Sequence, residues 1–263
     1  MTKPSKTVAI LGTLDTKGDE HAYAAKLISD SGLSTLLIDV GTGSAPTIEP
    51  DVTREEVASA GRIDLAEIQQ RNDRGECVTA MTEAAPKLVS RLAAEGKIHG
   101  ILSLGGGGGT AIGTAAMRGL PVGFPKVMVS TLASGNTAHY LGTKDITMIP
   151  SVVDVSGLNT ISRVIFSQAA GAICGMVRTK VAKDIKDRPI IAASMFGNTT
   201  ECVEAAKTIL ENSGYEVLVF HATGTGGKTM ESLISEGLIA GVLDVTTTEW
   251  ADELCGGVLS AGS

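Results

Sequence analysis

The feature that most constrains the fold is a strand-to-helix turn made of consecutive glycines: Gly105, Gly106, Gly107, Gly108 and Gly109. The apolar run 99–104 before it is typical of a buried strand, and the segment that opens with Thr110 is typical of a helix start. Backbone without side chains lets amides approach a ligand closely, and a helix N-terminus attracts anions. The turn therefore predicts an anion site at the amides of residues 106–110, with a purely structural tight turn as the alternative.

Strand and helix patterns alternate along the chain. Short apolar runs predict buried strands at 7–11, 35–39, 100–104, 126–130 and 146–149. Helical spacing between them predicts helices such as 18–31 and a long one at 158–180. Alternation of this kind implies parallel strands joined by right-handed crossovers, so we expect an α/β fold with a doubly wound sheet.

The pattern of the first residues returns after a charged segment that ends in Pro189. Residues 189–197 and 217–221 repeat the strand patterns of the N-terminus. In both halves of the chain this stretch ends in a glycine-rich turn, at 40–43 and at 222–226. This weak repeat predicts two Rossmann-like α/β subdomains, over residues 1–182 and 183–263, whose strand ends meet in a cleft. The glycine-rich apolar ending leads us to expect that the second subdomain is incomplete.

Composition excludes several classes of function. The formal charge of −7 and an aromatic content of 3% give neither a basic face nor a stacking platform, so we expect no nucleic-acid partner. No stretch approaches the roughly 20 apolar residues that span a bilayer, so we expect no membrane partner. The widely spaced cysteines are expected to be reduced, buried thiols of a cytoplasmic protein: Cys77, Cys174, Cys202 and Cys255.

The turn after the first strand, residues 11–18, carries Asp15 and Lys17. Ligands of parallel sheets bind at the carboxyl ends of the strands, which is where this turn lies. Lys17 could pair with a phosphate and Asp15 could hold Mg²⁺ through water. The alternative is that Asp15 or Thr16 caps the following helix.

Three further segments could contact a ligand. Residues 222–229 match a relaxed phosphate loop between a strand and a helix, although chance could produce so short a match. Residues 130–137 offer hydroxyl and amide side chains, either to a ligand or to ordinary turns. Asp154 lies in an apolar stretch and needs a partner such as a cation or amides. No nucleophile–base pair is evident, so catalytic residues stay unknown.

Seven sequence segments, taken in their order along the chain, form a pattern that is typical of one protein family: LGTLDTKG, GGGGGT, VMVSTLASGNT, DITMIPSVVDVSGLN, MFGNTT, HATGTGG and DVTTTEWADEL. With them the chain resembles an uncharacterised family of bacterial, fungal and plant proteins related to the ATP-binding N-terminal domain of the tomato mosaic virus resistance protein. The resemblance implies two Rossmann-like subdomains, ATP at or near their cleft, a homodimer and a protein longer than this chain.

Carried onto this sequence, the resemblance implies one ligand shell in two parts. The first subdomain would contribute Asp15, Thr16, Lys17, Gly105 to Gly109, Thr110, Ser130, Ser134, Gly135 and Asn136. The second would contribute Phe196, Gly197, Asn198, Gly224, Thr225, Gly226 and Gly227. Mg²⁺ would lie near Asp15 or Asp154.

Three functions stay open at this point. The first is an ATP-binding protein, extended to Mg²⁺-dependent phosphoryl transfer if it is an enzyme. The second is a non-catalytic nucleotide sensor or protein-binding module. The third is an enzyme that acts on a small carboxylate.

Overall fold

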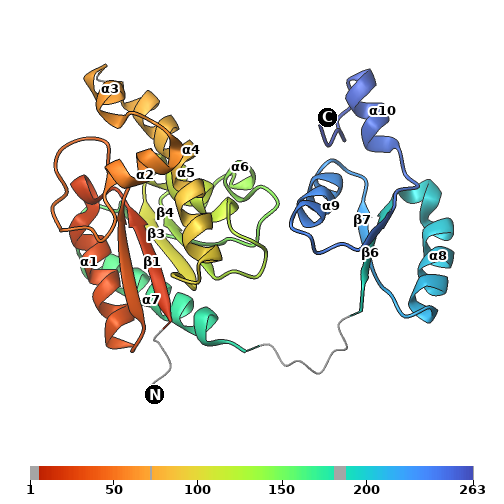
Figure 1. Cartoon of the computed structure of the whole chain (residues 1–263), viewed down its shortest axis with the longest axis horizontal. Helices are drawn as coiled ribbons and strands as arrows, with labels where there is room; N and C mark the ends of the chain where they lie inside the picture. Colours follow the sequence, from red (N-terminus) through yellow and green to blue (C-terminus); the bar gives the residue numbers. More distant parts are fainter. Residues whose placement is uncertain (1–5, 72, 181–187, 263) are drawn as a thin grey trace. The chain divides into compact units, whose positions relative to one another are not determined.

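A computed structural model describes residues 6–71, 73–180 and 188–262 of the chain (Figure 1). The chain divides into two compact units, Met1–Lys180 and Val181–Ser263, which we call the N-terminal unit and the C-terminal unit. Each has its own parallel β-sheet with helices between the strands, so the prediction of an α/β fold with two parallel sheets is confirmed.

The N-terminal unit is built on a sheet of strand order β2-β1-β3-β4-β5 in which every pairing is parallel. Its strands are β1 (Thr7–Gly12), β2 (Ser34–Asp39), β3 (Gly100–Gly105), β4 (Lys126–Ser130) and β5 (Thr147–Pro150). Its helices are α1 (Leu14–Asp30), α2 (Arg54–Gly61), α3 (Leu65–Gln70), α4 (Arg74–Ala94), α5 (Gly107–Arg118), α6 (Ala138–Leu141) and α7 (Thr160–Arg178).

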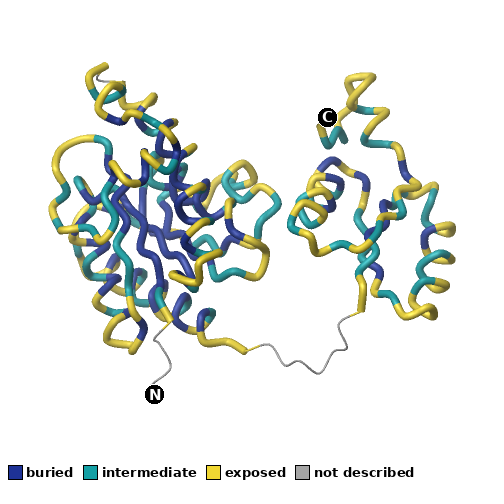
Figure 2. Tube along the Cα trace, in the orientation of Figure 1, coloured by how far each residue is buried: buried dark blue, intermediate teal, exposed yellow. Residues whose placement is uncertain are grey.

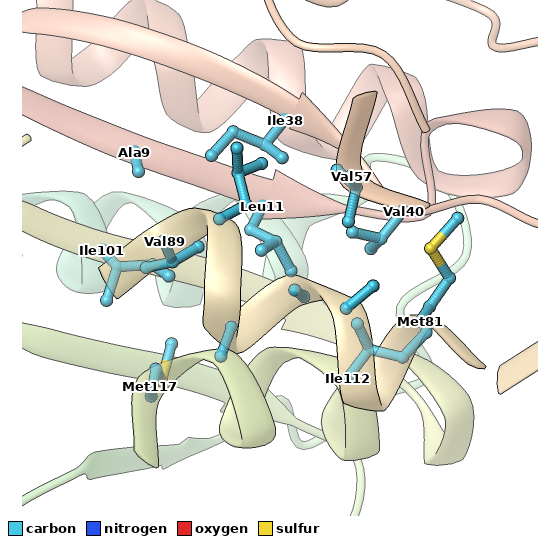
Figure 3. Close-up of a cluster of buried hydrophobic side chains, with 14 of the residues drawn as sticks. Ala9, Leu11, Ile38, Val40, Val57, Met81, Val89, Ile101, Ile112 and Met117 are labelled. Atoms are coloured by element: carbon cyan, nitrogen blue, oxygen red, sulfur yellow. The ribbon is translucent and has the colours of Figure 1, made fainter. Parts of the chain in front are cut away.

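Helices cover both faces of this sheet because successive side chains of each strand point to opposite faces. In β1, Ala9 and Leu11 belong to the core cluster under α2, α4 and α5, part of which is drawn in Figure 3. Val8 and Ile10 belong to the other cluster, under α1 and α7. The burial of both faces explains why the strands read as continuous apolar runs rather than as alternating ones.

One helix differs in detail from the sequence prediction. The helix expected from Gly18 begins at Leu14, with one non-helical residue, Lys17, inside its first turns. Glycine ordinarily weakens a helix, but Gly18 is buried in the interior of α1, where a Cβ would come within 2.0 Å of the Thr47 hydroxyl. Helix α4 runs through Pro86 without ending there.

Helix α7 is, among the described residues, the one helix long and apolar enough in composition to cross a membrane. The prediction that no stretch would qualify is therefore wrong by that criterion. Its buried residues, including Phe166, Ala170 and Ile173, pack in the core cluster of the N-terminal unit, as those of a core helix do.

The C-terminal unit has a smaller sheet of order β7-β6-β8, again parallel. Its elements are β6 (Ile190–Met195), the 3₁₀ turn η1 (Gly197–Thr199), α8 (Thr200–Asn212), β7 (Glu216–His221), α9 (Thr225–Ser235), β8 (Gly241–Leu243) and α10 (Thr248–Cys255). Figure 2 shows that most of this unit is intermediate or exposed, whereas β1, β3 and β4 of the N-terminal unit are buried almost throughout. Its buried cluster comprises Ala193, Val203 and Val217.

The cysteines do not all lie inside the protein. Cys77 and Cys174 are buried, whereas Cys202 on α8 and Cys255 at the end of α10 are exposed. The prediction of four buried thiols is wrong for these two. A helical context shows where a residue lies along the chain, but only the packing of the helix decides which of its faces meets solvent.

Candidate functional site

The candidate site lies at the carboxyl edge of the sheet in the N-terminal unit. From β1 the chain passes to β2 on one side and later to β3 on the other, so the strand order reverses between β1 and β3. Ligands of open α/β sheets bind outside the strand ends at such a reversal. A cavity of about 510 Å³ opens there, lined by the starts of α1 and α5, by the loops after β2 and β5, and by residues of α3 and α4.

The glycine turn forms one wall of this cavity. Gly105 must be glycine, because a Cβ there would come within 2.9 Å of the Cα of Gly109. Gly107 has no such requirement, since a Cβ there would meet nothing within 4 Å. The nearest atom to a Cβ on Gly106 would be the Thr131 hydroxyl at 3.8 Å. Packing within the protein therefore explains Gly105 but leaves free space beside Gly106 and Gly107, and both residues line the cavity.

The backbone amides at the start of α5 belong to the same wall of the cavity. Gly106 is the N-cap residue and supplies no side-chain cap, and the first backbone bond of the helix runs from the Thr110 amide to the Gly106 carbonyl at 2.8 Å. The amides of Gly107, Gly108 and Gly109 precede that bond, so helix geometry gives them no backbone acceptor. Such amides, together with the helix dipole, favour an anion.

Thr110 and Ser130 are buried behind this wall. Their hydroxyl oxygens are 2.6 Å apart, and the Ser130 oxygen also accepts the Leu132 amide at 3.0 Å. They join the glycine turn to the loop after β4 and have no exposed surface for a ligand.

The remaining residues predicted in the loop after β4 lie outside the cavity. Ser134 lines a neighbouring depression of about 270 Å³, which Asp154 also lines. The Gly135 amide closes a turn on the Leu132 carbonyl, and the Asn136 side chain accepts the Ala138 amide at 3.2 Å. These hydrogen bonds are ordinary turn chemistry.

The first turn of α1, directly after β1, brings Asp15, Thr16 and Lys17 to the cavity, as the sequence predicts for one site. The Asp15 carboxylate accepts the Gly43 amide at 2.8 Å and so fastens the loop after β2. Thr16 bonds within its own turn, to the Thr13 hydroxyl at 3.2 Å. The Lys17 ammonium has neither a hydrogen bond nor an ion pair with any residue that the structure describes. Lys17 is therefore the side chain at the start of α1 that is available to an anion.

A buried ion pair that sequence reasoning missed supports these loops. Asp39, at the end of β2, and Arg54, on α2, are 1% and 5% exposed, and the Arg54 Nε donates to the Asp39 carboxylate at 2.7 Å. The other Asp39 oxygen accepts the amides of Leu14 at 3.1 Å and Gly41 at 2.8 Å. The sequence did contain a signal for this pair, because Asp39 places a carboxylate at the end of an apolar strand pattern. Dinucleotide enzymes use such a residue for ribose, but here internal donors occupy it.

His21 supports the junction between β1 and α1. Its Nδ1 lies 2.6 Å from the Lys17 carbonyl oxygen, and a Cβ on Gly12 would come within 1.9 Å of its Nε2. Burial lowers the pKa of His21 below 6.5, so the imidazole is neutral at pH 7. The neutral ring packs against the end of β1 at Gly12 and bonds the backbone of Lys17 in the first turns of α1.

The wall formed by α3 and α4 was also missed. Gln69, Asp73, Arg74, Cys77 and Val78 line the cavity, although their sequence carries no recognised ligand motif. The Cys77 thiol is buried, and its pKa is raised by that burial and by the nearby Asp73 and Glu76 carboxylates. It therefore stays a thiol at neutral pH and is a poor nucleophile.

Asp154 reaches the cavity from the loop after β5. Two residues earlier, Val152 has a φ of 64°, and the Val153 amide bonds the Ser151 carbonyl at 2.7 Å in a strained tight turn. Asp15 and Asp154, predicted from distant parts of the sequence, thus line one cavity. No group of three or more His, Cys, Asp or Glu in the described ranges could hold a metal ion by protein ligands alone.

The phosphate-loop match in the C-terminal unit has an internal carboxylate at its amides. Glu249 accepts the Gly224 amide at 2.6 Å and the Gly227 amide at 3.0 Å, at the start of α9 where Thr225 begins the helix. A Cβ on Gly226 would come within 1.8 Å of the His221 carbonyl oxygen. Internal contacts therefore account for these glycines without a ligand.

The other predicted residues of this unit follow β6. The Phe196 amide donates to the Thr199 hydroxyl at 3.1 Å, and Gly197 and Asn198 are exposed in η1. They lie at the carboxyl end of the central strand of their own sheet. Their part in a ligand shell stays a prediction.

Comparison with known proteins gives consistent matches along the chain. A family model described as the N-terminal domain of an uncharacterised protein family (UPF0261) matches residues 6–182, and the model of its C-terminal domain matches residues 188–263. A UPF0261 protein of Clostridium tetani is 53% identical over 98% of this chain and 64% of its own length. The tomato (Solanum lycopersicum) ToMV resistance protein Tm-1(GCR237) is 38% identical over 98% of this chain and 37% of its own length.

The chain thus spans less than two thirds of the length of these relatives. Among solved structures, the UDP-N-acetylglucosamine 2-epimerase of Rickettsia bellii matches with a TM-score of 0.32 and 13% identity, over 93% of this chain and 69% of that one. A likeness of that size supports no inference about function.

Proposed function

The chain belongs to the uncharacterised protein family UPF0261, and we propose that its N-terminal unit binds a nucleotide, ATP, by its phosphates at the glycine turn. The observation that carries the proposal is the free space beside Gly107 on the cavity wall, next to amides that helix geometry leaves without acceptors. A glycine that no internal contact requires costs stability in a helix, and close approach of a ligand to the backbone explains that cost.

The size of the cavity and the presence of Lys17 on its wall fit this ligand. About 510 Å³ lies within the range of roughly 300–1,000 Å³ that small-molecule sites occupy. Lys17 adds a cation whose charge no described residue compensates. Ile112 and Val78 give part of the wall an apolar surface, as a site for an organic group beside a phosphate requires. ATP in particular is what the family resemblance implies.

Mg²⁺ would accompany the nucleotide. The ion is usually held by one or two carboxylates together with phosphate oxygens and water. Asp154 has no hydrogen bond or ion pair within the described part of the chain, whereas Asp15 already accepts an amide. We therefore assign the first role to Asp154 and a lesser one to Asp15. The ion would neutralise the phosphate charge beside these carboxylates.

The proposal is one of binding rather than of a defined reaction. Cys77 stays a thiol and His21 is buried away from the cavity surface, so neither supplies a nucleophile or base there. Phosphoryl transfer, if the protein performs it, would rest on positioning and charge neutralisation. A nucleotide-dependent sensor and an enzyme for a small carboxylate are the competing functions. The homodimer, the cytoplasmic location and a contribution from Phe196, Gly197 and Asn198 of the C-terminal unit belong to the proposal through the resemblance.

Calorimetric titration of the 263-residue chain tests the proposal. We expect ATP to bind, more tightly with Mg²⁺ than without it, and AMP to bind more weakly because it has fewer phosphate contacts. Binding of a nucleotide without any product over hours would favour the sensor. Binding of organic acids in the absence of any nucleotide binding would refute the proposal in favour of a carboxylate ligand.

A further inference from the structure

One face of α4 forms the cavity wall beside the glycine turn. Arg74, Cys77 and Val78 all line the cavity, and their spacing of three and four residues places them on a single helix face. A Cβ on Gly108 would lie 3.4 Å from the Val78 Cγ2, so this face touches the glycine turn. Arg74 is about one helical turn, roughly 5.4 Å, from Val78 along that face. The Arg74 side chain therefore belongs to the same wall of the cavity.

The charge of Arg74 is not used inside the protein. The neighbouring Asp73 carboxylate accepts the amides of Gly75 at 2.7 Å and Glu76 at 3.1 Å, which caps α4. No hydrogen bond or ion pair joins Arg74 to any residue of the described ranges. Arg74 also opens the first turn of α4, where the helix dipole disfavours a positive charge.

Arg71 provides an internal comparison because it lies outside the cavity and is fully engaged. Its guanidinium pairs with Glu67 at 2.7 Å and with Glu76 at 3.1 Å. An arginine of this segment that lies outside the cavity is thus paired with acidic side chains within five residues of it in sequence. Arg74 lacks them and faces the cavity instead.

We infer that Arg74 binds a phosphate of the ligand and that the ligand of this cavity is a polyphosphate, an inference that rests on the proposed function. The cavity brings together Lys17 from α1, Arg74 from α4 and the amides of α5. A guanidinium binds two phosphate oxygens at once, which a single lysine does not. Cationic groups on separate walls suit a chain of phosphates better than one carboxylate. The free carboxylate, Asp154, would be balanced by the Mg²⁺ that accompanies such a chain.

Titration of ATP, AMP and inorganic tripolyphosphate, each with Mg²⁺, into three proteins tests the inference: the 263-residue chain, Arg74→Gln and Arg71→Gln. We expect Arg74→Gln to weaken ATP and tripolyphosphate by roughly 10- to 100-fold, the loss of a charge-assisted contact, and to weaken AMP much less. Arg71→Gln should change none of them by more than about twofold. The unfolding midpoint shows whether Arg74→Gln remains folded, and the Arg74 side chain has no hydrogen bond or ion pair with the described residues to lose.

The outcomes separate the two proposals. Wild-type protein that binds ATP, with Arg74→Gln binding it equally well, overturns the role of Arg74 and leaves the proposed function standing. Equal weakening by both substitutions also overturns it, because the effect would then be one of general charge. Wild-type protein that binds neither ATP nor tripolyphosphate refutes both proposals.

Discussion

The substitution Gly107→Ala separates ligand binding from folding at the glycine turn. The added methyl group meets nothing within 4 Å, and the backbone of Gly107 lies outside the left-handed region, so alanine fits the folded protein. Gly107 is the first residue of α5, and alanine is the better helix former. We therefore expect the free energy of unfolding to rise by roughly 0.4–1 kcal/mol, measured from the urea midpoint at constant slope.

The same methyl group should abolish close approach of a phosphate. It projects into the free space that carries the proposed function, beside the amides of residues 107–109. Each hydrogen bond to a charged ligand contributes about 1.5–3 kcal/mol, so the loss of even one corresponds to a fall in affinity of roughly 10- to 100-fold. The variant is thus expected to be more stable than wild type without ligand and to bind ATP far more weakly in calorimetry.

Two matched variants make this result interpretable. Gly171→Ala on α7 is also exposed, helical and free of neighbours within 4 Å, so it should raise stability comparably and leave ATP affinity unchanged. Gly105→Ala places its methyl group 2.9 Å from the Gly109 Cα and should cost about 1–3 kcal/mol of stability. Unchanged ATP affinity in a stable Gly107→Ala protein would refute the reasoning, because the space beside Gly107 would then not be where the ligand binds.

Three further predictions concern the support of the site. Lys17→Ala should weaken ATP binding about tenfold and leave the urea midpoint unchanged, since the ammonium has no partner among the described residues; equal affinity would remove it from the site. Asp39→Ala should lower the free energy of unfolding by about 3–5 kcal/mol, because it leaves the buried Arg54 charge unpaired; a loss below 1 kcal/mol in urea denaturation would contradict the role of this pair. Burial lowers the pKa of His21, so the unfolded chain binds a proton more readily; the stability that His21 contributes is full above about pH 6.5 and is lost as pH falls below it. When the pH is lowered from 7.5 to 5.5, the urea midpoint should fall in wild type and in the exposed control His139→Gln, and it should fall less in His21→Gln. An equal fall in all three proteins would assign the pH dependence to groups other than His21.

Much of the fold could be predicted because buried parallel strands leave a strong local signal. The strand at Lys126–Ser130 has the predicted bounds, and the five glycines join a strand to a helix as expected. The helix, however, begins at Gly107 rather than at Thr110, and Gly105 still belongs to β3. The start of α1 could not be placed, since Gly18 is retained in a helix for tertiary packing against Thr47. Local propensity is overridden wherever such packing decides.

The candidate site was predictable in its loops but not in its walls. Residues that follow strands, such as Lys17 and Gly107, meet at one sheet edge by topology, which the strand order fixes. Arg74 reaches the same cavity only because α4 packs against the glycine turn, and no local motif records that packing. Glu249 is 22 residues from Gly227 in sequence, so the phosphate-loop pattern alone could not show that its amides already bind a carboxylate.

The most direct measurement of the central claim is an NMR titration of ATP with Mg²⁺ into protein labelled with ¹⁵N-glycine. The account predicts that the amide signals of Gly107, Gly108 and Gly109 shift with increasing ATP, because the phosphates bind at the start of α5. It predicts that the signals of Gly224 and Gly227, whose amides already bond Glu249, stay in place. Shifts at Gly224 and Gly227 with the α5 amides unmoved, or no shift at any of these glycines, would contradict it.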